Sequence, residues 1–414
     1  MITRREILAG FGALASGIAP PLISRANPAS ASSSLSSLPA KRDFGSPADL
    51  TYLNCAYTHP MPAAAAAALR DWVEYRAHPQ VVSAPKRFES NVKAEFAALI
   101  NAKESEISYV ESTSAGENLV VNGLDINYRS DNVVTDALHF EGALLHLQQL
   151  QQRYGLDVRT LMPRDWRIEL QDLERAIDKK TRLVELSLVA MCNGFQPDLK
   201  AVCDLAHSRG AYVYADLAQA AGNTPIDVRA TGVDFCACSS FKWLMGDFGL
   251  GFLYVKEDLL DRVIRRSQYG YYQASVMESH FLPGDRPDPA AYTFTLENTA
   301  SGHFESGTKS IGAAHVLAIS LPYIRRLGVE NILAYRQPLL RRLQQEMPRL
   351  GYPPLTPPES TSPLVSFSVK DPKAVEQRLQ TARVNARVAE RYIRISPSVF
   401  NDMNDVEKLL EALA

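Results

Sequence analysis

The chain has 414 residues, of which 46% are hydrophobic, as in a soluble globular protein with room for two domains of ordinary size. Its 44 Lys and Arg residues nearly balance its 46 Asp and Glu residues, which gives a net charge of −2 and no long run of like charge. Nucleic acid is therefore not an expected partner. Five Cys residues without a CxxC pair predict neither a disulfide framework nor a metal site.

Residues 1–31 have the pattern of an export signal. A charged start that contains Arg4 and Arg5 precedes the apolar run Ile7–Ile23, and the small-residue cleavage pattern Ala29-Ser30-Ala31 follows. Paired arginines before a mildly apolar run resemble the twin-arginine signals that export folded proteins in bacteria. Gly and Pro residues dilute the run, which disfavours a retained membrane anchor. We expect cleavage, a periplasmic location and no stable membrane insertion afterwards.

Residues 32–47 are rich in Ser, Pro and Ala and predict a flexible linker. Two amphipathic helices are expected next. The first begins after Pro62, with Leu69, Trp72, Val73 and Arg76 at helical spacing. The second is marked by a set of apolar residues with the same period: Phe88, Val92, Phe96, Leu99 and Ile100.

From there, short β-rich runs alternate with helical patterns, which predicts an α/β fold with a mainly parallel sheet. The expected strands are Ile107–Val110, Asn132–Thr135, Val158–Leu161, Arg182–Val189, Ala211–Ala215 and Asp234–Cys238. Cys236 and Cys238 lie in the last of these runs, where buried packing is the favoured interpretation.

One helix–strand unit is well marked by its local signals. Asp198 is placed to cap a helix, Gly210 to end it, and Ala211–Ala215 to run as a strand up to Asp216. Ligands of parallel sheets bind at the carboxyl ends of the strands, where Asp216 is expected. Residues 48–310 are assigned to this large domain. Residues 311–414 are assigned to a smaller C-terminal α+β domain, with a long apolar helix, a strand at Leu364–Val369 and a final helix near Asp405–Leu413.

Polar groups from three separate segments are expected at this edge of the sheet: Ser112–Gly116, Asp216 with Gln219, and Ser239–Lys242. Small hydroxylated residues before a helix suit a phosphate, although an ordinary helix cap is the favoured interpretation of this signal alone. Lys242 precedes an apolar Trp-Leu-Met run, where desolvation favours a neutral, nucleophilic amine. The coincidence of the three segments indicates one site.

These residues resemble the class V aminotransferase family of pyridoxal-phosphate (PLP) enzymes, of fold type I. The likeness is strongest from Tyr214 to Ala220, through Pro225–Val228 and Ser239–Trp243, and into Gly249–Val255. Further matches are Thr113–Asn118, Phe304–Thr308, and Arg394–Pro397 with Asn401. The resemblance implies a large domain built on a mainly parallel, seven-stranded type of sheet, together with the small C-terminal domain.

The resemblance also implies roles for individual residues. Lys242 would hold PLP as a Schiff base and move protons at the substrate carbon, and Asp216 would keep the pyridine nitrogen protonated. Gln219 would donate to the phenolic oxygen of the ring. Phe140 is at the position where relatives stack an aromatic ring or a histidine on the cofactor, with core packing as the alternative.

For the phosphate, the resemblance implies Ser114, the backbone of Thr113 and the hydroxyl of Ser239 as donors, with Thr308 reaching in from a second subunit of a homodimer. Arg394 is the candidate that binds the substrate α-carboxylate, with a structural ion pair as the alternative. Asp125, Glu141, His139 and Arg387 are further possible pocket residues.

The sequence also departs from the family pattern. The cysteine-desulfurating branch has a nucleophilic Cys in its C-terminal third, whereas no Cys occurs here after Cys238, so that activity is not expected. Phe241 replaces a histidine that relatives often have before the lysine, and Met191 lies where relatives have an asparagine near the ring. The role of nearby Asn193 is left open.

The favoured function is a PLP-dependent enzyme acting on an amino acid or an amino-acid moiety of a metabolite, by aminotransferase-type chemistry through Cα–H cleavage. Epimerase and β-lyase activity remain open alternatives. A non-catalytic binding protein on the same fold is the alternative from another class. An NAD-dependent enzyme is disfavoured, because no Gly-rich fingerprint follows a predicted strand.

Overall fold

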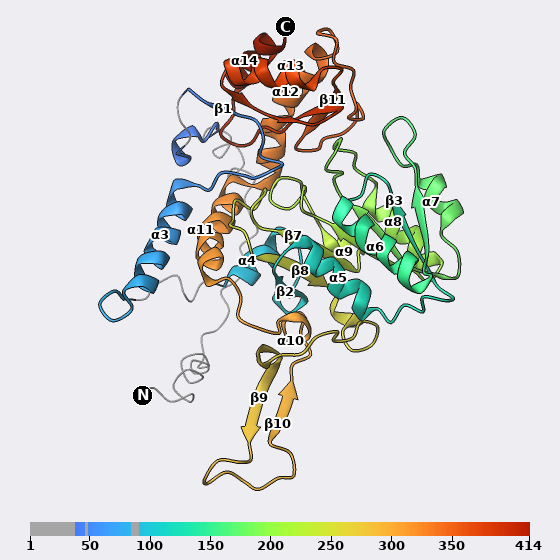
Figure 1. Ribbon diagram of the computed structural model, residues 1–414, viewed down its shortest axis with the longest axis vertical. Helices are drawn as coiled ribbons and strands as arrows, with labels where there is room; N and C mark the ends of the chain where they lie inside the picture. The colour runs from blue at the N-terminus through green and yellow to red at the C-terminus, as the bar shows by residue number, and fades with distance from the viewer. Residues whose placement is uncertain (1–37, 46–48, 84–90) are drawn as a thin grey trace.

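The computed structural model describes residues 38–45, 49–83 and 91–414, and its centre is a seven-stranded sheet (Figure 1). The strand order is β2-β8-β7-β6-β5-β3-β4, and only β8 runs antiparallel to its neighbours. The strands are β2 (Ile107–Val110), β3 (Asn132–Asp136), β4 (Asp157–Leu161), β5 (Thr181–Ser187), β6 (Tyr212–Asp216), β7 (Phe235–Ser239) and β8 (Gly251–Val255). The predicted mainly parallel α/β sheet is confirmed, with strand ends shifted by at most two residues.

Helices cover both faces of the sheet because each strand has apolar side chains on both sides. On one face, α5 (Thr113–Gly123) and α6 (Glu141–Tyr154) pack against Tyr214, Phe235 and Leu253. On the other face, α4 (Val92–Leu99), α8 (Leu199–Ser208) and α11 (Ile311–Leu327) pack against a second set: Val184, Val213, Cys236, Cys238 and Phe252. Cys236 and Cys238 are buried free thiols, as predicted.

Local signals set the helix ends. In α8, the Asp198 carboxylate accepts from the Ala201 N–H, and Gly210 at φ +82 lies just past the helix end, in a conformation that glycine adopts without strain. The first predicted helix is α3 (Ala63–Ala77), and the second is α4; the Phe88 that was assigned to it lies outside the described residues. The predicted export signal, residues 1–31, also lies outside them.

The C-terminal part forms a second core. It contains α12 (Val329–Glu346), α13 (Pro372–Thr381), α14 (Met403–Leu413) and an antiparallel sheet of β11 (Val365–Ser368), β14 (Tyr392–Ile395) and β13 (Arg387–Val388). The N-terminal strand β1 (Thr51–Tyr52) pairs in parallel with β12 (Val384–Asn385), so this segment joins the small domain. The boundary at residue 310 stays a prediction; α11 packs on α3 and α4, within the core of the large domain.

A two-stranded hairpin, β9 (Ala274–Ser279) and β10 (Tyr292–Leu296), projects from the body at the end opposite the small domain (Figure 1). The remaining helices are α7 (Leu170–Ala176), α9 (Val228–Thr231) and α10 (Ala300–Phe304), with short 3-10 turns η2 (Lys41–Asp43), η4 (Glu104–Glu106), η5 (Glu257–Leu259) and η6 (Tyr271–Gln273). Among the described residues, no helix combines the length and apolarity needed to span a membrane.

Candidate active site

The three predicted segments meet at the carboxyl ends of β6 and β7. Asp216 is the last residue of β6, Ser239 is the last of β7, and Thr113 begins α5 directly after β2. The Thr113 N–H donates to Ser239 Oγ at 3.0 Å, and the two hydroxyls are 2.9 Å apart. The loop after β7 then carries Lys242, and the Asp216 carboxylate is close enough to raise the pKa of this lysine. The expected convergence on one site is therefore observed.

Lys242 has the environment of a nucleophilic amine. Burial lowers its pKa, the Asp216 carboxylate opposes this shift, and the positive charge of Arg394 adds to it. Among the residues that the structure describes, no ion pair involves Lys242. Its Nζ lies 5.9 Å from the centre of the Phe140 ring and 5.8 Å from that of Phe241. An amine in such surroundings is more readily deprotonated than a surface lysine.

Asp216 and Gln219 are held in place by neighbouring groups. Asp216 is 6% exposed, and its Oδ1 accepts from the Ala218 N–H at 2.7 Å. Burial raises the pKa of Asp216, and His139 opposes this shift. Gln219 Nε2 donates to the Ala56 carbonyl at 2.9 Å, and its Oε1 accepts from Trp243 Nε1 at 2.8 Å. The second Nε2 hydrogen of Gln219 remains for a ligand.

The start of α5 provides donors for an anion. Ser112 caps the helix by accepting from the Ala115 N–H, which leaves the Ser114 hydroxyl at the first turn. Gly142 is required close by, because a Cβ there would lie 2.6 Å from the Phe140 ring and 3.3 Å from Ser114 Oγ. Phe140 thus lies beside the Lys242 amine, and its ring approaches the start of α5.

Arg394 is a buried guanidinium on β14. It is 3% exposed, its Nη1 donates to the Met191 carbonyl at 2.9 Å, and its Nε has no hydrogen-bond partner within the described ranges. Burial lowers the pKa of Arg394. The structural ion pair weighed as the alternative is not seen for Arg394 in the described part of the chain. Met191 thus contributes its backbone to the site.

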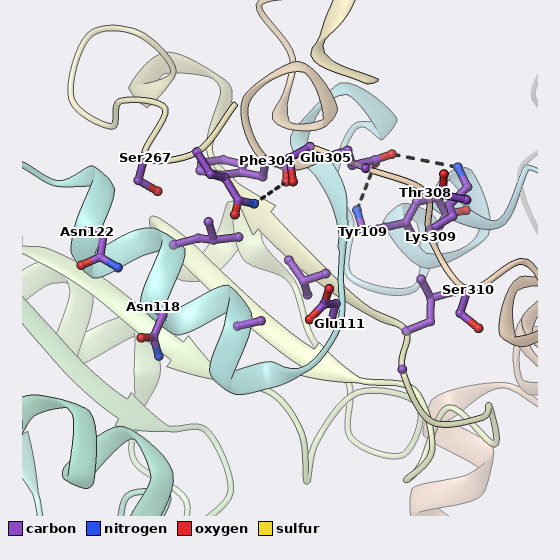
Figure 2. Close-up of a pocket in the computed structure, with 18 residues that line it drawn as sticks. Tyr109, Glu111, Asn118, Asn122, Ser267, Phe304, Glu305, Thr308, Lys309 and Ser310 are labelled. Carbon is purple, nitrogen blue, oxygen red and sulfur yellow. Dashed lines mark hydrogen bonds and ion pairs between the residues drawn. The ribbon is translucent and has the colours of Figure 1, made fainter. Parts of the chain in front are cut away.

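Thr308 is exposed and bonds to Tyr271 of its own chain, with 2.9 Å between the two hydroxyl oxygens. It lines a hollow of about 780 Å³ on the outer side of α5. Figure 2 shows Thr308, Lys309 and Ser310 on one side of this hollow and Asn118 and Asn122 of α5 on the other. Neither Lys242 nor Asp216 lines it, so this hollow is not the site of the buried amine.

The remaining residues that the sequence suggested for the pocket have positions or contacts of their own. Asp125 forms a surface ion pair with Arg265 at 3.5 Å, and Glu141 is exposed at the start of α6. Asn193 holds a turn through the Trp166 and Leu355 carbonyls, which accounts for it structurally. Arg387 lies opposite Arg394 across the β13–β14 pair and over the Tyr57 ring.

His139 is buried and belongs to a cluster that the sequence did not reveal. Its ring nitrogens face Ser187 and Glu185, and Glu117 lies nearby on α5. The signal available in the sequence was the placement of two glutamates within apolar runs, Leu183–Leu186 and Gly116–Val121. That signal is weak without the strand register.

The residues present fit PLP. Lys242 is buried and has no ion pair among the described residues, so its amine suits the aldehyde of PLP. The buried Asp216 carboxylate suits the pyridine nitrogen, and the Phe140 ring suits the planar ring of the cofactor. The hydroxyls at the start of α5 suit the phosphate. In the described part of the chain, His, Cys, Asp and Glu side chains nowhere gather in groups of three or more that suit a metal ion.

The chain is similar to known proteins over most of its length. The sequence pattern of the family described as "Aminotransferase class-V" matches residues 52–409. A "Probable cysteine desulfurase" of Methanothermobacter thermautotrophicus is 29% identical over 297 residues, which is 70% of this chain and 70% of that protein. A "Cysteine desulfurase" of Shigella sonnei is 32% identical over 245 residues, which is 58% of this chain and 57% of that protein.

Solved structures share the fold. The cysteine desulfurase CsdA of Escherichia coli has a TM-score of 0.78 at 21% identity, covering 90% of this chain and 97% of that one. An apo cysteine desulfurase of Thermococcus onnurineus has a TM-score of 0.78 at 26% identity, covering 90% and 96%. A C-DES variant with glycine covalently linked to its PLP cofactor has a TM-score of 0.76 at 22% identity, covering 90% and 98%.

Proposed function

Because the chain belongs to the class-V aminotransferase family, whose enzymes depend on PLP, we propose that it removes the Cα proton of an amino acid or an amino-acid moiety, in aminotransferase-type chemistry. The observation that carries this proposal is the Lys242 amine, near Asp216 and Arg394 and without an ion pair among the described residues. A non-catalytic binding protein has no use for such an amine.

Each residue has a task in this proposal. Bound PLP supplies an electron sink for negative charge that develops at Cα. Lys242 holds the cofactor and then carries the proton to and from Cα, for which its lowered pKa is suited. Asp216 keeps a proton on the ring nitrogen. Arg394 binds the carboxylate and thereby fixes which bond at Cα stands next to the lysine.

A second candidate is β-elimination from a sulfur-containing amino acid, which the names of the desulfurase relatives favour. No Cys follows Cys238 in the sequence, so sulfur would leave into solution rather than onto a thiol of the C-terminal third. Burial raises the pKa of the Cys192 thiol, although Arg394 opposes this shift, so this thiol is not an activated nucleophile. Both reactions begin with the same proton removal.

The test is incubation of the holoenzyme with single amino acids in D₂O. Exchange of the α-hydrogen for deuterium is expected for at least one of them, and the products then separate the candidates. A keto acid with amine transfer indicates transamination, pyruvate with sulfide indicates elimination, and racemate alone indicates epimerisation. If neither free amino acids nor short peptides that carry them exchange an α-hydrogen, the binding-protein alternative replaces the proposal.

We also propose a homodimer. The hairpin β9–β10 is a two-stranded ribbon with exposed apolar side chains, and such ribbons are marginal alone in water. These side chains are between 42% and 57% exposed: Val276, Met277, Phe281, Leu282, Phe294 and Leu296. Thr308 bonds to Tyr271, just before β9, so a second copy that covers this hairpin would also lie near Thr308.

Phe294→Asp should therefore weaken association, because a charge buried at an interface lacks a partner. Sedimentation should show dimer for the wild type and monomer for Phe294→Asp at the same concentration. Val81→Asp, at a residue 84% exposed, is the matched control and should stay dimeric. A wild-type monomer that retains PLP tightly would contradict the shared site.

Thr308→Ala tests the same proposal without disturbing assembly. The dimer should persist, while cofactor binding should weaken by about 1 kcal/mol, the net value of one hydrogen bond, or somewhat more because phosphate is charged. Equilibrium PLP binding measures this effect. Equal affinity in the variant and the wild type would remove Thr308 from the phosphate site.

Export to the periplasm by the twin-arginine route remains a proposal, supported by Arg4-Arg5 and by Ala29-Ser30-Ala31. That route carries folded proteins, so PLP loaded in the cytoplasm would be exported within the enzyme. Changing Arg4 and Arg5 together to Lys should leave precursor in the cytoplasm, measured by cell fractionation. Mature protein delivered to the periplasm as before would count against the route.

A further inference from the structure

A row of buried polar side chains lies next to Asp216 on the sheet face that α5 and α6 cover. Glu185 of β5 is in register with Tyr214 of β6, and Ser187 is in register with Asp216. Residues two apart on a strand point to the same face, so all four side chains share it. Glu185 is 0% exposed and Tyr214 is 1% exposed. An acid at this depth requires a partner.

His139 connects Glu185 to the edge where Asp216 lies. Its Nδ1 lies 2.8 Å from Ser187 Oγ, and its Nε2 lies 3.5 Å from Glu185 Oε1. Both side chains of this ion pair are fully buried. The positive charge of His139 favours the ionised form of Asp216, and this effect is larger than the opposing effect of the Glu185 carboxylate. The pair therefore couples Glu185 to Asp216.

Glu117 of α5 extends the cluster outward. It is 1% exposed, its Oε1 lies 2.8 Å from His146 Nδ1, and its Oε2 accepts from Asn118 Nδ2 at 2.7 Å. Burial and the nearby Glu185 carboxylate raise the pKa of Glu117, which favours its protonated form. Among the described residues, both oxygens of Glu185 lack a hydrogen-bond donor, because His139 Nε2 faces one of them at 3.5 Å without forming a hydrogen bond. A proton on Glu117 supplies that donor.

These shifts favour the neutral form of Glu117 and the charged form of His139, which faces Glu185 at 3.5 Å. Burial disfavours a charged imidazole, but Glu185, Asp216 and Asp136 outweigh this effect and raise the pKa of His139. Other titratable groups face the cluster from the surrounding elements: Tyr214 on β6, His146 on α6 and Lys242 after β7.

We propose that Glu185 and His139 are positioning residues for the cofactor: their ion pair keeps Asp216 ionised and thereby keeps the ring nitrogen of PLP protonated. Glu117 stabilises this state by sharing its proton with Glu185. The inference rests on the proposed role of Asp216. Without Glu185, burial dominates at His139, the imidazole loses its proton, and Asp216 loses the positive charge that holds it ionised.

The test compares two cofactors that differ only at the ring nitrogen. The full-length chain, freed of cofactor, is titrated with PLP and with deazapyridoxal phosphate, which has carbon in place of that nitrogen. Glu185→Gln should weaken PLP binding by about tenfold, the equivalent of one pKa unit, and leave the binding of the analogue unchanged. In holoenzyme made with ring-¹⁵N PLP, the nitrogen signal should shift towards the unprotonated position.

Controls separate this inference from the function on which it rests. Asp216→Asn should abolish the preference for PLP over deazapyridoxal phosphate. Adding Glu185→Gln to the Asp216→Asn variant should cause no further loss of PLP binding. Glu106→Gln, at a 4% exposed glutamate before β2, should keep the wild-type preference. His139→Gln removes directly the positive charge beside Asp216. It therefore replaces Glu185→Gln in the test if the Glu185→Gln variant does not fold.

If Glu185→Gln weakens both cofactors equally, or neither, the role of the ion pair is wrong while the assignment of Asp216 stands. If Asp216→Asn keeps the preference for PLP, the assignment of Asp216 fails, and this inference fails with it.

Discussion

Lys242→Ala should abolish the covalent, borohydride-reducible link to PLP and lower the rate by about a thousandfold or more, because in the proposed function the same amine holds the cofactor and moves the Cα proton. The wild-type protein should be yellow. The variant should bind PLP only reversibly, since the residues around the ring and the phosphate remain. Mass spectrometry after borohydride treatment measures the loss, and D₂O exchange measures the rate.

Lys200→Ala is the matched control, because Lys200 is an exposed residue of α8 that pairs with Asp204 at 2.6 Å. It should keep both the reducible link and the rate. If borohydride fixes one equivalent of PLP to the Lys242→Ala variant, another lysine is the anchor and the assignment is wrong.

The parts of the fold that the sequence predicts are those with local causes. The α8–β6 unit has its cap at Asp198, its helix end marked by Gly210 and an apolar strand that stops at Asp216, all within one stretch of chain. Buried parallel strands read as apolar runs because both faces are covered, and this pattern located six strands. The three polar segments converged because strand ends in a parallel sheet share one edge.

Features without a local signature in the sequence were not predicted. The strand β1 is only two residues long, and its partner Val384–Asn385 lies near the other end of the chain. The hairpin β9–β10 has exposed side chains on most of its length, so no buried face shapes its sequence. The cluster at Glu185 appears only when strand register places it beside Tyr214 and His139, since a single Glu in an apolar run has no local signature.

Arg394 illustrates the limit within the site itself. The sequence predicts that Arg394 is at a carboxylate-binding position. It does not predict that Arg394 is buried or that it bonds to the Met191 carbonyl. Both depend on the pairing of β14 with β11 and on contact with a distant part of the chain. In the described part of the chain Arg394 has no carboxylate partner, and its Nε has no acceptor. A substrate carboxylate would satisfy both.

Arg394→Ala should therefore lower kcat/KM by about 30-fold or more, because truncating one partner of a buried charged pair costs about 2–5 kcal/mol. The PLP absorbance should remain, since the role proposed for Arg394 is to bind the substrate and not the cofactor. Lysine should rescue poorly, because its point charge lacks the fork geometry that matches a carboxylate.

Arg387→Ala is the informative comparison, because Arg387 lies opposite Arg394 but is exposed over the Tyr57 ring. Its loss should cost less, since solvent screens an exposed charge. If Arg394→Ala keeps the wild-type rate while Arg387→Ala loses it, the carboxylate anchor is Arg387. If simple amines react with the wild-type enzyme as well as amino acids do, the site does not recognise a substrate carboxylate. Neither Arg394 nor Arg387 would then select the substrate in this way.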